Sequence, residues 1–164
     1  MTTRRDFIAT ASKGLLGASA LPAFGPIRPG LGRTASGTGL VYDRRYLDHV
    51  LPERAGEAHP ESPLRLVRMM EVFAERGLDE AVAPLSLLDD PLSYVQYAHT
   101  AEHVDSVSTI DVSGRIAELA VSGALGAVEA VAGGTVKNAF CASRPPGHHA
   151  NNTGAEEGFC FYSN

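Results

Sequence analysis

The chain has 164 residues, of which 44% are hydrophobic and 20% are charged. This composition is typical of a single globular domain and argues against disorder, collagen and coiled coil. The formal net charge of −5 gives no support to a nucleic-acid-binding surface. The two cysteines, Cys141 and Cys160, do not form a CxxC pair, so the sequence indicates neither a disulfide framework nor a thiolate zinc site.

The N-terminus has the pattern of an export signal. Arg4 and Arg5 precede a small, weakly apolar stretch that ends in Ala18-Ser19-Ala20, a pattern that a signal peptidase accepts. The arrangement resembles a bacterial twin-arginine signal. We expect residues 1–20 to be a cleaved signal peptide and residues 21–38 a linker. The protein would then be exported by the twin-arginine machinery to the periplasm or the exterior, without a stable membrane anchor. A basic arm followed by an ordinary Ala-rich helix is the alternative.

Strand-like and helix-like segments alternate along the rest of the chain. The expected order is a strand at 40–42, a polar loop at 43–63, a helix at 63–76, a strand at 84–88, short helices at 91–97 and 100–107, a helix at 117–132 and a strand at 136–142. The helix at 63–76 is the clearest, because its apolar residues recur at helical spacing and Gly77 follows it. The alternation predicts a parallel α/β sheet whose ligands gather at the carboxyl ends of the strands.

The strand expected at 136–142 leads directly into Arg144-Pro145-Pro146-Gly147-His148-His149-Ala150. Its two prolines stiffen the turn, and Gly147 would allow close backbone approach to a ligand. His148 and His149 then stand side by side at the end of a strand, where an α/β protein places its active site. Neighbouring histidines can divide acid and base work, because a first proton on the pair opposes a second. A polar loop with two exposed histidines is the alternative.

Several segments in order resemble the histone-deacetylase-like family, and most closely its second class and the bacterial acetylpolyamine and acetoin-utilisation members. The segments are RPPGHHA at 144–150, GFCFYSN at 158–164, HPESPLRL at 59–66, HTAEHV at 99–104 and GALGAVEAV at 123–131. The first two are highly specific as a pair, whereas the other three are weak when taken singly. The resemblance identifies residues 39–164 as the N-terminal part of a deacetylase-like catalytic domain.

The resemblance implies the arginase/deacetylase α/β fold, a parallel sheet flanked by helices. It also implies removal of an acetyl or other acyl group from an amine, such as acetyl-lysine or an acetylpolyamine, by a zinc-bound water. By matching motif, His149 corresponds to the general base and His148 to its partner. Gly158 and Phe159 correspond to one wall of the narrow substrate channel, and we count Gly147 with them as substrate-binding. Arg65 matches an arginine of the family's product channel, although a surface helix arginine would look the same.

The resemblance also leaves parts of the family's machinery unaccounted for. The family's metal ligands, an Asp-x-His pair and a later Asp, and its transition-state tyrosine have no counterpart up to Asn164. A parallel α/β sheet of perhaps three strands also could not have both of its faces covered. We therefore expect the domain to continue beyond Asn164, with all ligands of one zinc ion there, and the 164-residue chain to be inactive alone. Residues 108–116 should form part of the active-site rim.

Two other functions remain open from the sequence. His99-Thr100-Ala101-Glu102-His103 fits the H-x-x-E-H pattern of some zinc peptidases. On a helix, His99 and His103 would share a face and could bind one metal, with Glu102 as the base. An exported binding protein without catalysis is the third possibility, because no metal ligand can be assigned.

Overall fold

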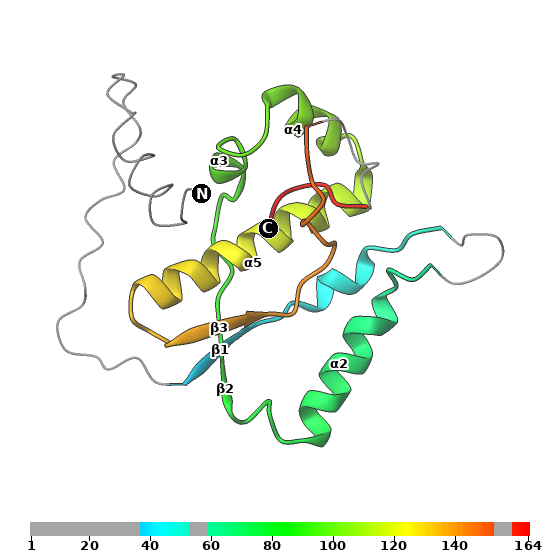
Figure 1. Cartoon of the computed structure of the whole chain (residues 1–164). Coiled ribbons are helices and arrows are strands. Elements are labelled where there is room, and N and C mark those ends of the chain that lie inside the picture. The colour runs from blue at the N-terminus through cyan, green and yellow to red at the C-terminus, as the bar shows by residue number, and fades with distance from the viewer. Residues whose placement is uncertain (1–36, 53–58, 153–158) are drawn as a thin grey trace, which may run out of the picture.

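The computed structural model describes residues 37–52, 59–152 and 159–164, and Figure 1 shows how they are arranged. The expected signal peptide, most of the expected linker and Gly158 lie outside these ranges. Three strands form one parallel sheet in the order β2-β1-β3: β1 (Thr38–Val41), β2 (Val82–Pro84) and β3 (Asn138–Cys141). All three carboxyl ends therefore meet at one edge, and the predicted parallel α/β fold with flanking helices is confirmed.

The described helices are η1 (Arg44–Asp48, a 3-10 helix), α2 (Pro63–Glu75), α3 (Leu92–Val95), α4 (Ala101–Ser108) and α5 (Asp111–Ala132). α2 begins where the Ser62 hydroxyl accepts the N–H of Leu64, and Pro63 occupies the first turn, where no N–H is needed. The hydroxyl of Thr100 caps α4 in the same way by accepting the N–H of His103. None of the helices in the described ranges is long and apolar enough to span a lipid bilayer.

Helices lie on both faces of the sheet (Figure 1). The ring of Phe140 on β3 stacks on Phe73 of α2, with centroids 5.8 Å apart. Its strand neighbours Ala139 and Cys141 point to the other face, where they line a hollow together with residues of α5. α5 approaches closely because a Cβ at Gly126 would collide with the carbonyl of Ser86. Side chains of β3 therefore point toward a helix on each face of the sheet.

Apart from small shifts at the ends of other elements, the structure departs from the predicted elements in three places. α5 begins at Asp111 rather than at 117, because its first turns are polar and are joined by an exposed Asp111–Arg115 ion pair (2.9 Å) instead of an apolar stripe. β2 covers 82–84 rather than 84–88, because the chain then bends toward α5, where the N–H of Leu88 donates to the Ser122 carbonyl (3.0 Å). The loop expected at 43–63 contains η1, which the carboxylate of Asp43 caps.

Candidate active site

His148 and His149 follow β3 on a tight turn at the carboxyl end of the sheet. The turn is closed by a hydrogen bond from the Ala150 N–H to the Gly147 carbonyl (3.0 Å). The two imidazole centroids are 4.3 Å apart with the rings tilted by 50°, and both residues are exposed. The two adjacent, exposed imidazoles therefore lie at the edge of the sheet where the sequence predicted them.

The two histidines line a pocket of about 750 Å³. Its other lining residues are Pro60, Glu61, Arg65, Leu66, Met69, Ser143, Arg144, Pro146 and Phe159. The structure thus brings four predicted site residues together from three distant segments: His148, His149, Phe159 and Arg65. None of residues 108–116 lines this pocket, so the expected contribution of that segment to the rim is not seen there; it forms the start of α5 instead.

Phe159 has a backbone conformation that is rare for a bulky residue. Its φ of 61° lies in the left-handed region. This conformation costs about 1–3 kcal/mol and persists only where surrounding contacts hold it. One such contact is the ring of His59, which meets Phe159 edge to face with centroids 4.5 Å apart. His59 is itself oriented, because its Nδ1 accepts the backbone N–H of Glu61 (3.0 Å). Phe159 forms an apolar part of the pocket lining, and His59 packs against it without lining the pocket.

Gly147 is buried behind the pocket instead of lining it. A Cβ at this position would collide with the Tyr162 carbonyl oxygen and would lie 2.5 Å from Oδ1 of Asn164. The expectation that Gly147 permits the approach of a ligand is therefore corrected, since the close approach is made by the C-terminal segment of the chain itself. The amide of Asn164 also donates to the Pro145 carbonyl (3.1 Å), so this segment supports the turn from below.

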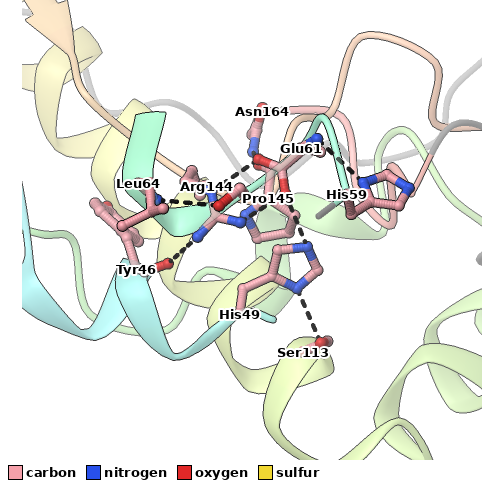
Figure 2. Close-up of polar contacts among 10 residues, drawn as sticks. Tyr46, His49, His59, Glu61, Leu64, Ser113, Arg144, Pro145 and Asn164 are labelled. Atoms are coloured by element: carbon pink, nitrogen blue, oxygen red, sulfur yellow. Dashed lines mark hydrogen bonds and ion pairs between the residues drawn. The ribbon is translucent and has the colours of Figure 1, made fainter. Parts of the chain in front are cut away.

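A buried ion pair lies beneath the turn (Figure 2). Arg144 donates from Nε and Nη2 to the two carboxylate oxygens of Glu61 (2.7 and 2.6 Å) and from Nη1 to the Tyr46 carbonyl (3.0 Å). Both charged side chains are about 5% exposed. Burial alone would raise the pKa of Glu61, but its contacts with His49 and Arg144 outweigh burial and lower that pKa to about 2. Glu61 is therefore ionised at neutral pH.

Sequence reasoning missed this ion pair, although both partners lie in motifs that the sequence singles out. Glu61 belongs to the segment at 59–66 and Arg144 to the segment at 144–150. A buried position for each could have been suspected, because both stand among apolar and proline residues. Their pairing could not have been suspected from the sequence, because 83 residues separate them and no local spacing links them.

His99 and His103 do not form the arrangement that the peptidase hypothesis needs. His99 precedes the N-cap of α4, so the two rings, stacked at 4.7 Å, do not stand on one helix face. The Nε2 of His99 accepts the N–H of Ser163 (3.0 Å), and the Nε2 of His103 bonds to the Phe161 carbonyl (2.7 Å). Glu102 is exposed. Both Nε2 atoms are thus occupied by the backbone, and the geometry argues against a shared metal.

The described residues do not assemble a metal site. Within residues 37–52, 59–152 and 159–164, no three His, Cys, Asp or Glu side chains come together in a way that could hold a metal ion. The pocket itself offers His148, His149 and the carboxylate of Glu61, but that carboxylate is bound to Arg144. These residues do not fit a resident zinc ion, and we assign no ligand among them.

Comparison with known proteins decides the family. A sequence model of the histone deacetylase domain matches residues 59–164. The chain belongs to the histone deacetylase domain family. It is 32% identical over 151 residues to histone deacetylase 15 of Arabidopsis thaliana, covering 82% of this chain and 27% of that protein. It is 33% identical over 144 residues to a probable deacetylase of Archaeoglobus fulgidus, covering 77% and 38%.

A human relative and a solved structure agree with this membership. The chain is 29% identical over 149 residues to human polyamine deacetylase HDAC10, covering 78% of this chain and 22% of that protein. The crystal structure of the HDA15 HD domain superposes with a TM-score of 0.72 at 31% identity, covering 80% of this chain and 41% of the other. The chain therefore spans well under half the length of each of these relatives, and the fold predicted from the resemblance is confirmed over the described part.

Proposed function

We propose that the complete protein is a metal-dependent hydrolase that removes an acetyl or other acyl group from an amine. The observation that carries this proposal is the pair of exposed imidazoles, His148 and His149, facing a pocket with an apolar wall in a member of the deacetylase family. Family membership supports zinc as the cofactor. Its ligands are expected outside the described residues, so the steps below involve only this chain's side chains.

In this proposal His149 is the general base. One of its ring nitrogens accepts the proton of the water that attacks the acyl carbon. His148 lies beside His149, with the two ring centroids 4.3 Å apart. His148 also assists protonation of the leaving amine. The pair thus moves protons into and out of the reaction without a net change in charge.

The pocket walls support binding of an aliphatic acyl-amine. Phe159, Leu66 and Met69 present apolar surface, and burying substrate methylenes against such a surface contributes about 0.8 kcal/mol each. Arg65 lines the same pocket and is exposed, so its guanidinium can bind the carboxylate of released acetate. These features fit acetyl-lysine and acetylpolyamines equally. The relatives include proteins named for each substrate class.

The test is a kinetic comparison of three variants of the complete protein on an acetyl-lysine peptide and on an acetylpolyamine. His149→Ala should lower kcat by about 10²–10⁴-fold, the usual worth of general acid–base catalysis. KM and metal content should change little, because His149 acts in the transition state and is not a proposed ligand. His148→Ala should lower kcat by a smaller factor.

Glu102→Gln is the matched control, because the peptidase alternative makes Glu102 the essential base. It should leave deacetylation close to that of the wild type, since Glu102 is exposed and does not line the pocket. Loss of activity in Glu102→Gln together with full activity in His149→Ala would contradict the assignment and favour the peptidase. A wild-type protein that binds but never hydrolyses acetyl-amines would favour the non-catalytic binding protein.

We also propose that the protein is exported by the twin-arginine route, on the basis of the residue pattern at positions 1–20. Replacing Arg4 and Arg5 by Lys should leave the precursor in the cytoplasm, and the wild-type mature protein should begin near Leu21. N-terminal sequencing and cell fractionation measure both outcomes. Normal periplasmic accumulation of the double variant would rule out this route.

A further inference from the structure

A fully buried histidine lies next to the ion pair beneath the catalytic turn (Figure 2). His49 is 0% exposed and follows η1, so it comes from a segment far from β3 in sequence. Its Nε2 lies 3.5 Å from Oε2 of Glu61, and its Nδ1 lies 2.9 Å from the hydroxyl oxygen of Ser113 on α5. Among the residues described by the structure, Nε2 has no hydrogen-bond partner of good geometry, so the Glu61 carboxylate is a close polar contact and not a formed hydrogen bond.

The Ser113 contact sets the direction of the imidazole. If the Ser113 hydroxyl donates to Nδ1, the ring carries its proton on Nε2, and that N–H faces the Glu61 carboxylate. A buried carboxylate needs several donors, because each oxygen has lost the water that would otherwise solvate it. Arg144 supplies two of these donors to Glu61, and Nε2 of His49 approaches Oε2, the oxygen that also accepts from Nη2 of Arg144.

We propose that His49 is a positioning residue that acts through Glu61 and Arg144 to hold the turn bearing His148 and His149. This inference rests on the proposed deacetylase function and deepens it. Glu61 and Arg144 line the same pocket as the two histidines, and Arg144 precedes His148 by only four residues. When His49 loses its contact with Glu61, the carboxylate gains freedom to shift, and Arg144 and the turn shift with it.

The side-chain lengths of Asn and Gln separate the two contacts of the His49 ring. His49→Gln places an amide N–H near the Nε2 position and keeps a donor for Glu61. His49→Asn places its polar atoms near the Nδ1 position, so it keeps the contact with Ser113 and loses the one with Glu61. Both variants place a polar amide side chain in the buried space that the His49 ring occupies.

In the complete protein, kcat on an acetyl-amine should fall about tenfold in His49→Asn, less than the roughly 100-fold that 1 Å of misplacement can cost. It should stay within about threefold of the wild type in His49→Gln, with KM unchanged in both, because the lost alignment acts on the transition state. Circular dichroism gives the folded fraction by which each kcat is corrected. A kcat that falls in His49→Asn but is retained in His49→Gln is the readout that a merely structural role would not produce.

The control is His103→Gln, which alters another buried histidine, one that bonds to the Phe161 carbonyl and does not line the pocket. It should lower stability and leave the corrected kcat unchanged. Equal kcat values in His49→Asn and His49→Gln, or a loss confined to KM, would overturn the inference. A wild-type protein without acetyl-amine hydrolysis would instead overturn the proposed function itself.

A milder variant keeps the proposal testable if His49→Asn does not fold. Ser113→Ala removes only the bond that orients the ring, at a helix position where Ala is well tolerated. It should lower kcat about threefold at unchanged KM, since the imidazole then turns away from Glu61 for part of the time. An unchanged kcat in Ser113→Ala would overturn the inference in that case.

Discussion

Two pairs of histidines in this domain have opposite environments. The rings of His99 and His103 are stacked at 4.7 Å and buried, whereas those of His148 and His149 are 4.3 Å apart and exposed at the pocket. In the buried pair, ring nitrogens bond to the backbone of residues 161 and 163. In the exposed pair, no ring forms a hydrogen bond with any residue in the described ranges. Proximity alone therefore does not distinguish the two pairs; their ring contacts within the described residues do.

The same C-terminal segment lies against both pairs. His99 and His103 contact it through their rings, whereas the backbone of His149 forms a hydrogen bond with Cys160. The backbone carbonyl of Tyr162 fills the space next to Gly147. Burial raises the pKa of the Cys160 thiol, and a backbone hydrogen bond from His149 offsets part of that effect. The two pairs thus contact the C-terminal segment in different ways, and each can be disturbed separately.

The largest expected effect is on the ion pair that supports the exposed histidines. Arg144→Met leaves the Glu61 carboxylate buried without its main partner, and breaking such a pair costs about 3–5 kcal/mol of unfolding free energy. Adding Glu61→Leu should recover most of the loss, because an apolar pair leaves no buried charge. Urea unfolding of the complete protein measures both. No recovery in the double variant would mean that Arg144 acts mainly through the Tyr46 carbonyl.

The next-largest effect comes from replacing one histidine of each pair by Ala and comparing the losses of stability. His103→Ala should lower the unfolding free energy by about 1–3 kcal/mol, because the buried Phe161 carbonyl loses its donor. His149→Ala should change stability by less than about 0.5 kcal/mol, since the ring is exposed. The kcat corrected for the folded fraction should fall strongly in His149→Ala and change little in His103→Ala. Equal stability losses in the two variants would remove the distinction between a structural and a catalytic pair.

The sequence predicted much of the fold because its strongest signals are local. Apolar spacing with Ser62 and Pro63 in front predicted α2 to within one residue of its end. The start of α5 was missed because its first turns are polar and carry no apolar stripe. The alternation of strand-like and helix-like segments was sufficient to predict the parallel sheet.

The candidate site was predictable only where chemistry lies within one segment. His148 and His149 are adjacent, so their motif is visible in the sequence, and the structure places them at the predicted edge of the sheet. His49 and Glu61 come from another segment and meet Arg144 only after folding. Gly147 was assigned to ligand approach because a sequence does not show that Tyr162 occupies the space beside it.

The smallest expected effect is a pH dependence that belongs to the buried pair. Burial lowers the pKa of His99 below its ordinary value of 6.5, and the nearby His103 acts in the same direction, although the bond to Asn152 opposes both. Above pH 6.5 the ring is neutral in both the folded and unfolded states, so its contribution to stability is fully present. As the pH falls from 6.5 through the folded-state pKa, the unfolded chain binds a proton that the folded protein resists, and stability is lost.

The variant that isolates this effect is His99→Gln, whose amide oxygen can accept the Ser163 N–H but does not titrate. Between pH 7.5 and 5.5, the unfolding free energy of the wild type should fall more steeply than that of the variant. Glu61 does not interfere, because its pKa moves from 4.5 in the unfolded chain to about 2, so its contribution is lost only at lower pH. Parallel curves for wild type and variant would show that the buried pair is not held in its neutral form, and the contrast with the exposed pair would then rest on stability alone.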